Sequence, residues 1–366
     1  MMKKVLFLFA QNDLSGHTKF VAELARELNE MEYECTVYVP IFTHFWYTYE
    51  VRSFKFKTHR WMRYFLGQIK NMIKQNRFEW AGKNIYSNIK VKRYLFLPKI
   101  KYMSNFDKII TSAGWHIREL RSLNFKDFTK IIHVIHHPHT ETHDALDDDF
   151  RSGNFPIIVS SAYTKNICKN LQYRISEVIL LGVGKKFFKP IYKPSSPKLK
   201  IGFFFRNVNR KNPDLILKTI ESLNKIEKNI EIFIFGSGFK DEFLSFSVNV
   251  LQNLSEDDYV SELAKMDIFV YISKVEGFGL PPLEAMALGI PVVASDVGAV
   301  SEFIQNEIDG IIVSVIGTES DYCDQIIDLI HSQEKRALIG DQAKIKASTM
   351  TWKNVAEKYS KYLTAK

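Results

Sequence analysis

The chain has 366 residues, of which 46% are hydrophobic and 25% charged, and its formal net charge is +9. This composition excludes a disordered chain and a coiled coil, and the length favours two domains of roughly 150 residues each. Three cysteines lie far apart and give neither a disulfide framework nor a metal-ligand spacing. These dispersed cysteines lead us to expect a reduced, cytoplasmic protein, and no apolar run approaches the ~20 residues that cross a bilayer.

The first half of the chain alternates strand and helix signals. Val5–Phe9 is a continuous apolar run typical of a buried parallel strand, and helical periodicity and a second run, Cys35–Val39, follow it. Strands alternating with helices predict a parallel sheet covered on both faces. Four further strands are expected at Lys108–Thr111, Ile131–Ile135, Ile157–Ser160 and Val178–Leu181.

The segment Lys189–Lys198 is rich in proline and serine, which is typical of a linker. A second series of strands and helices begins directly after it. We therefore expect two doubly wound α/β domains, residues 1–188 and 189–349. The second series comprises strands at Lys200–Phe205, Glu231–Phe235 and Ile268–Ile272, with helices from Asp214, near Glu256–Met266, and at Ser320–His331, Gln333–Ala347 and Trp352–Tyr362.

Positive charge is concentrated between Val51 and Tyr102. This block holds fourteen Lys or Arg residues and one acidic residue, a balance of +13, so the rest of the chain carries 9 − 13 = −4. Within it, Trp61–Ile73 has an apolar and a basic face at helical spacing. Such a helix lies on an anionic membrane surface, binds nucleic acid, or packs on its own domain. The sequence favours the packed helix and the membrane over nucleic acid.

Two loops that follow strands of the second half carry charged residues where α/β sheets bind ligands. In Phe205–Pro213, Arg206 and Lys211 precede a helix and suit a diphosphate, with Arg210 as a substitute for either. The alternative is an exposed basic loop. In Ser273–Glu284, free amides at a helix N-terminus suit phosphate or sugar hydroxyls. Glu276 and Glu284 would accept hydrogen bonds from hydroxyls, or would be an ordinary loop charge and a solvated helix residue.

The first half offers a third loop and a histidine cluster. Gly16, in the loop after the first strand, allows a close backbone approach, although neither this loop nor Gly236–Gly238 forms a GxGxxG fingerprint. Five histidines follow or lie on the strand Ile131–Ile135. They would bind an acceptor, serve the structure, or ligate zinc or manganese, although alternation along a strand argues against a metal site. These histidines are His133, His136, His137, His139 and His143.

Taken together, these loops resemble the retaining nucleotide-sugar glycosyltransferases with the GT-B fold, a large family rich in bacterial cell-surface polysaccharide enzymes. EGFGLPPLEAMALGIPVVAS, residues 276–295, resembles the family signature of two glutamates separated by seven residues. FRNVNRK, residues 205–211, resembles its Arg…Lys diphosphate loop. The resemblance implies two Rossmann-like domains facing across a cleft, with the C-terminal helix, residues 350–366, packing back on the first.

The resemblance also implies roles for individual residues. Arg206 and Lys211 would bind the donor diphosphate, Glu276 the transferred sugar, and Glu284 the ribose. On the first domain, Gly16 would approach the diphosphate and His136 would lie on the acceptor side. No metal or other cofactor is expected. Backbone amides for the sugar and phosphates would come from Gly277, Phe278, Gly279 and Leu280.

The resulting hypothesis is a retaining hexosyl- or deoxyhexosyltransferase that uses a nucleoside-diphosphate sugar. Its acceptor would be a glycan or a lipid-linked carrier, and residues 51–102 would hold it at the inner face of the cell membrane. Three alternatives remain open from the residues alone. They are a nucleotide-sugar epimerase of the same fold, a glycoside hydrolase using the two glutamates, and a non-enzymatic nucleic-acid-binding protein.

Overall fold

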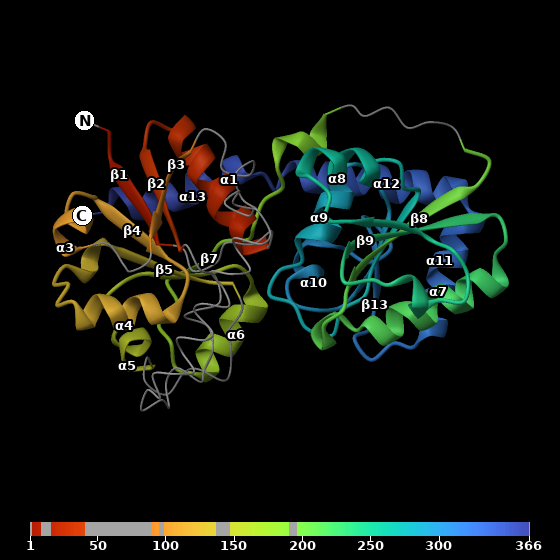
Figure 1. Ribbon diagram of the computed structural model, residues 1–366, viewed down its shortest axis with the longest axis horizontal. Helices are drawn as coiled ribbons and strands as arrows, with labels where there is room; N and C mark the ends of the chain where they lie inside the picture. Colours follow the sequence, from red (N-terminus) through yellow and green to blue (C-terminus); the bar gives the residue numbers. More distant parts are fainter. Residues whose placement is uncertain are drawn as a thin grey trace, which may run out of the picture.

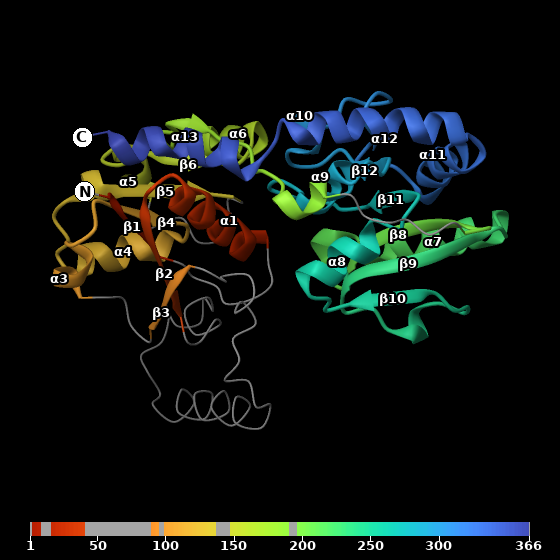
Figure 2. The ribbon, with the colours of Figure 1, turned by 90° about the horizontal axis from the view of Figure 1, so that it is seen from above.

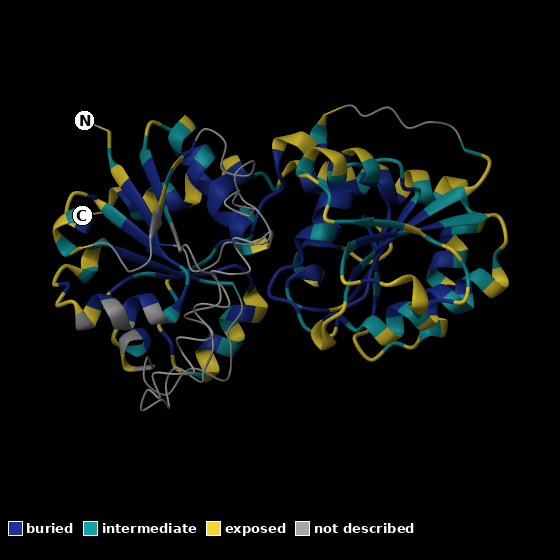
Figure 3. Ribbon diagram, viewed as in Figure 1, coloured by how far each residue is buried: buried dark blue, intermediate teal, exposed yellow. Residues whose placement is uncertain are grey.

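The computed structural model describes residues 2–8, 16–40, 89–94, 99–136, 147–189 and 196–365. Within these ranges the chain forms two α/β halves, each built on its own parallel sheet (Figure 1). Buried strands occupy the centre of each half, and the exposed residues lie mainly on the helices and loops around them (Figure 3). The two doubly wound domains that the sequence predicts are therefore confirmed.

The first sheet has the order β3-β2-β1-β4-β5-β6-β7, with parallel neighbours. The chain builds outward from β1 to β3 and then crosses to β4 on the other side of β1. The switch point of the strand order, where such sheets bind ligands, therefore lies at the carboxyl ends of β1 and β4. The elements are β1 (Lys4–Leu8), α1 (Gly16–Glu30), β2 (Glu34–Pro40), β3 (Lys90–Tyr94), α3 (Ile100–Met103), β4 (Lys108–Thr111), α4 (Gly114–Ser122), β5 (Ile131–Ile135), α5 (Asp147–Ser152), β6 (Ile157–Val159), α6 (Ala162–Asn170) and β7 (Glu177–Val178).

The second sheet has the order β10-β9-β8-β11-β12-β13, again all parallel. Its switch point lies between β8 and β11, so the loops after these two strands meet at one edge. The elements are β8 (Leu199–Arg206), α7 (Pro213–Ile226), β9 (Ile230–Ser237), β10 (Asn249–Gln252), α8 (Glu256–Leu263), β11 (Ile268–Tyr271), α9 (Leu280–Ala287), β12 (Val292–Ser295), α10 (Val300–Phe303), β13 (Ile311–Val313), α11 (Glu319–His331), α12 (Gln333–Ser348) and α13 (Trp352–Thr364).

Two parts of the first domain differ from the sequence prediction. The strand expected at Val178–Leu181 is paired only over Glu177–Val178, because the chain then leaves the sheet to join the second domain. The strand β3 was not expected, since its sequence Lys-Val-Lys-Arg-Tyr is basic rather than apolar. It lies at the edge of the sheet, where charged side chains remain accessible to water.

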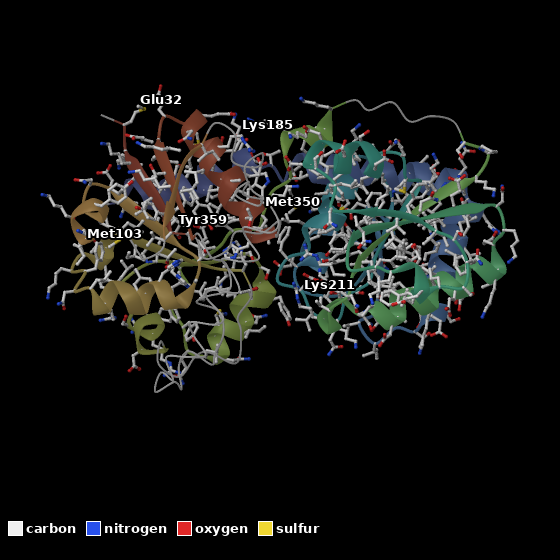
Figure 4. All side chains as sticks on the ribbon, viewed as in Figure 1. Glu32, Met103, Lys185, Lys211, Met350 and Tyr359 are labelled. Carbon is white, nitrogen blue, oxygen red and sulfur yellow. The ribbon has the colours of Figure 1, made fainter. Side chains whose placement is uncertain are left out.

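The last helix crosses back from the second half to the first, as Figure 2 shows for α12 and α13. In Figure 4, Met350 lies where the halves meet and Tyr359 lies inside the first half. Trp352 and Tyr359 are buried, and the ring centroid of each lies 6.0 Å from that of Phe20 on α1. The backbone amide of Val183 donates to the Met350 carbonyl at 2.9 Å, which ties the crossing to the interdomain segment.

Further contacts fix the two halves against each other. One cluster of buried apolar residues extends from β1 and α1 through α13 and Phe187 to α9. On α10 of the second half, the Glu302 carboxylate accepts hydrogen bonds from the backbone amides of Ala162 (2.9 Å) and Tyr163 (3.1 Å), at the N-terminus of α6. A carboxylate is favourable there because the first amides of a helix have no partner within the helix.

The basic helix expected at Trp61–Ile73 lies outside the described residues, so the membrane hypothesis stays a prediction. Among the residues that the structure describes, no helix is both long and apolar enough to cross a membrane.

Candidate functional site

The loops after β8 and β11 are bound to each other at the edge of the second sheet. The backbone amides of Lys274 and Val275 both donate to the Arg210 carbonyl, at 2.9 and 3.3 Å. The Ser273 hydroxyl lies 2.9 Å from the same carbonyl. These contacts follow from the pairing of β8 with β11, which brings their carboxyl ends together. The two loops that the sequence singled out thus form one surface.

A buried ion pair joins these loops. The side chain of Lys211 is 7% exposed and that of Glu276 8%. The Lys211 ammonium donates to Glu276 Oε1 and, at 2.7 Å, to the Tyr271 hydroxyl. Ser273 Oγ lies 2.8 Å from the same carboxylate oxygen, and the Arg210 guanidinium lies 3.8 Å from the other. Glu276 is therefore held on several sides and is not a freely solvated loop charge.

The two members of the pair perturb each other's protonation. Burial lowers the pKa of Lys211 to about 8, while the attraction of Glu276 opposes this. Burial by itself raises the pKa of Glu276, but Lys211, Ser273 and Arg210 outweigh it and hold that pKa below its usual range. At neutral pH the site therefore carries a buried cation and a buried anion together.

Arg206 lies at the end of β8, close enough to Lys211 to lower its pKa further. The Nε atom of Arg206 is buried and, within the described part of the chain, has no hydrogen-bond partner. A buried guanidinium N–H without a partner is costly unless an acceptor receives a hydrogen bond from it. The expected pair of Arg206 and Lys211 is thus brought together with Arg210 at one sheet edge. Lys211 lies on the side of the second domain that faces the first (Figure 4).

The helix α9 begins beside Glu276. Gly279, at its N-cap, has φ = 95°, a conformation that favours glycine, and Pro281 and Pro282 occupy its first turn. Because proline has no N–H, the amides that this turn can offer to an anion or a hydroxyl are those of Gly279 and Leu280. Phe278 is buried and stacks on Phe303 with ring centroids 5.2 Å apart, so only its backbone can serve a ligand.

Glu284 lies one turn further along α9 and is paired with the opposite domain. Lys19 on α1 donates to Glu284 Oε1 at 2.5 Å and lies 3.4 Å from Glu256 on α8. Lys186 also contacts Glu256, at 3.1 Å. Burial raises the pKa of the Tyr259 phenol well above its ordinary value, and the nearby Glu284 carboxylate adds to this. The sequence analysis did not single out Lys19. The signal that could have found it is its position in the first turn of the helix that begins at Gly16.

The N-terminal turn of α1 also contacts the other expected site residues. A Cβ placed on Gly16 would lie 3.3 Å from Leu280 Cδ1, so Gly16 packs directly against the start of α9. The His17 ring lies 4.9 Å from that of His136, in an edge-to-face arrangement. Successive residues of this turn thus join His136, Leu280 and Glu284 into one region where the two domains meet.

The histidines of the first domain form a buried, neutral group. Burial lowers the pKa of His116 and of His133 to about 3, and lowers that of His136 well below its ordinary value. His133 Nδ1 lies 2.7 Å from the Thr111 hydroxyl and serves the structure. Neither ring nitrogen of His136 has a hydrogen-bond partner within the described ranges. Both ring nitrogens of His136 are therefore available to a ligand.

The residues expected as alternative metal ligands are only partly described. His137, His139 and His143 lie outside the described residues. Within 2–8, 16–40, 89–94, 99–136, 147–189 and 196–365, no three His, Cys, Asp or Glu side chains gather in a way that could hold a metal ion.

Comparison with known proteins agrees with this geometry. Residues 185–346, which include the second sheet and its loops, match the family model of the glycosyl transferases group 1. An uncharacterised glycosyltransferase of Methanocaldococcus jannaschii is 27% identical over 208 residues, 54% of this chain and 55% of that one. A lipopolysaccharide core biosynthesis mannosyltransferase of Rhizobium meliloti is 29% identical over 161 residues, 37% of this chain and 46% of that one. The chain thus spans about half the length of these curated relatives.

The fold comparison covers the whole chain. The crystal structure of the Anabaena protein HepE in complex with UDP and glucose superposes with a TM-score of 0.72 over 99% of both chains, at 15% sequence identity. Two Rossmann-like domains of this kind define the GT-B fold, so the predicted fold class is confirmed. The chain is a GT-B protein whose second domain matches the group 1 glycosyl transferases.

Proposed function

We propose that this protein is a retaining glycosyltransferase that moves a hexosyl or deoxyhexosyl group from a nucleoside-diphosphate sugar to a glycan or lipid-linked acceptor. The observation that carries the proposal is the convergence of Arg206, Arg210 and Lys211 beside the N-terminus of α9. Cations and free amides at one point suit a diphosphate. The match of this domain to the group 1 glycosyl transferases supports the same conclusion.

In this proposal the leaving diphosphate is stabilised as its charge grows. Arg206 and Lys211 neutralise it, and the backbone amides of residues 277–280 donate to it. The departing phosphate takes the proton of the acceptor hydroxyl on the same face of the sugar, so the protein supplies no base. Glu276 orients the sugar, and Glu284 binds the ribose hydroxyls. Because two cationic side chains serve the diphosphate, we expect no requirement for a metal ion.

The acceptor side is proposed from the first domain. The neutral ring of His136 suits a hydrogen bond to a sugar hydroxyl, as donor or acceptor. The relative from Rhizobium meliloti is named for lipopolysaccharide core biosynthesis. The proposed acceptor is therefore an intermediate of a surface polysaccharide, assembled at the inner face of the membrane. Residues 51–102 would hold the enzyme at that membrane.

Binding of a nucleoside diphosphate tests the proposal directly. We expect one of the diphosphates of uridine, guanosine, thymidine or adenosine to raise the melting temperature, because a ligand at about 100 times its Kd stabilises by about 2.7 kcal/mol. Arg206→Ala removes a charged hydrogen bond worth about 1.5–3 kcal/mol, so its affinity should fall at least about tenfold. Indifference of the wild type to all four diphosphates would contradict the proposal. Conversion of the donor sugar without any acceptor would indicate an epimerase instead.

The rate should also depend on the charge of Lys211. Burial lowers the pKa of Lys211 to about 8, so the cation that binds the diphosphate is present below that pH and is lost above it. We expect kcat/KM for the donor, which reports the free enzyme, to fall with increasing pH above about 8. Lys211→Arg keeps its charge throughout this range and should remove the decline. An unchanged profile in that variant would show that another group titrates.

A further inference from the structure

Lys19 lies on the first domain, but its ammonium group lies among acidic residues of the second. It donates to Glu284 Oε1 at 2.5 Å and lies 3.4 Å from Glu256 Oε1. The ammonium also lies 4.6 Å from the centroid of the Phe187 ring, in a cation–π arrangement. The side chain is 16% exposed and that of Glu284 only 6%. This ion pair therefore links the two domains at a point largely shielded from water.

The charge of Lys19 is firmly maintained. Burial by itself lowers the pKa of Lys19, but Glu284, Glu256 and Glu23 outweigh it and raise that pKa above its usual value. The pKa of Glu256 is lowered: burial opposes this, and Lys19 and Lys186 overcome it. The Lys19 ammonium is thus charged throughout the pH range in which a diphosphate donor would bind.

The contact affects the carboxylate that the proposed function assigns to the ribose. Lys19 meets Glu284 at Oε1, which restricts the orientation of the carboxylate that would receive the diol. Without Lys19, the partly exposed Glu256 and the buried Glu284 would lie close together and repel each other, so Glu284 would turn away from the ribose. Lys19 also comes from the same helical turn as Gly16, which packs against Leu280. The first domain thus contacts the donor region of the second through this turn.

We infer that Lys19 is a positioning residue of the donor site, which holds Glu284 in the orientation that receives the ribose hydroxyls. It acts through Glu284 and touches neither the sugar nor the phosphates. Since Lys19 and Glu284 belong to different domains, donor affinity then depends on how closely the domains approach. The inference rests on the proposed function, because it assumes that Glu284 binds the ribose.

Calorimetric titration with two probes separates this role from a merely structural one. The probes are the nucleoside diphosphate that stabilises the wild type and its 2′,3′-dideoxy analogue, which lacks the ribose hydroxyls. Lys19→Met should bind the complete diphosphate about tenfold more weakly, the size of one hydrogen bond to a charged group. It should bind the dideoxy analogue as the wild type does. Lys19→Arg should restore most of the affinity for the complete diphosphate.

Lys185→Met is the matched control. Lys185 lies close to Lys186 in the chain and is also ion-paired, but to Glu27 and Glu30 on α1, and its side chain is 60% exposed. Its loss should leave both affinities unchanged. Glu284→Gln should lose the preference for the complete diphosphate over the dideoxy analogue, as Lys19→Met should. The double variant Lys19→Met, Glu284→Gln should lose no more affinity for the complete diphosphate than either single variant.

The possible outcomes distinguish the inference from the proposed function. Equal weakening of both probes by Lys19→Met would mean that Lys19 serves the phosphates or the fold, which overturns the inference alone. Unchanged affinity for both would overturn it as well. A wild type that binds neither probe would overturn the proposed function and this inference together.

Discussion

Lys211→Met should lower kcat/KM for the donor by at least about 100-fold, a change of about 2.7 kcal/mol at 1.36 kcal/mol per tenfold. The ammonium of Lys211 is buried between Glu276 and Tyr271, beside Arg206 and Arg210. Methionine keeps the volume of the side chain and removes the charge that is proposed to face the diphosphate. Initial rates at varied donor concentration, at neutral pH where Lys211 is a cation, measure the effect.

The same substitution should destabilise the protein. Removing one partner of a buried ion pair leaves the other uncompensated, which costs about 3–5 kcal/mol. Here Glu276 is left with Ser273 and the half-exposed Arg210, 3.8 Å away. The double variant Lys211→Met, Glu276→Gln removes both charges, so we expect it to regain most of the stability and none of the activity. Denaturant unfolding of both variants checks this. Wild-type donor kinetics in Lys211→Met would remove Lys211 from the site.

The prediction of the second domain succeeded because its signals are local. Lys200–Phe205 and Ile268–Ile272 are apolar runs bounded by charged loops, and they match β8 and β11 within a residue or so. Once both are parallel strands, their loops lie at the carboxyl edge, and pairing of β8 with β11 brings Lys211 to Glu276. The strands β10, β12 and β13 were missed. The strand β10 is only half apolar, and the apolar run of β12 continues from α9, so periodicity does not separate the two.

Contacts between the domains were beyond sequence reasoning. The pairing of Lys19 with Glu284 depends on how two separately folded sheets face each other, and no periodicity encodes that orientation. The capping of α6 by Glu302 is of the same kind. Likewise, the sequence placed His133 on the strand Ile131–Ile135 and His136 directly after it, but it could not show that His17 and His116 lie near them from other elements. Short-range patterns thus specified the elements and their loops, whereas the pairing of charges across the junction required the structure.

Glu276→Gln should lower kcat/KM for the donor by about 100-fold at neutral pH, similar to the loss of one group that stabilises developing charge. The glutamine keeps the shape but removes the anion that sustains the charge of Lys211. Since Glu276 raises the pKa of Lys211 against the effect of burial, that pKa should fall below about 8 in the variant. The alkaline decline of kcat/KM should therefore move to lower pH, and activity should partly recover on acidification.

The double variant Lys211→Arg, Glu276→Gln separates the two contributions of Glu276. Arginine stays charged without a carboxylate partner, so the pH-dependent part should disappear and only the direct contact of Glu276 with the sugar should be missing. An unmoved alkaline decline in Glu276→Gln would show that Glu276 does not control Lys211. Intact-mass spectrometry after incubation with donor alone tests the remaining alternative. A glycosyl adduct on the wild type that is absent from Glu276→Gln would make Glu276 a covalent nucleophile, contrary to the orienting role proposed for it.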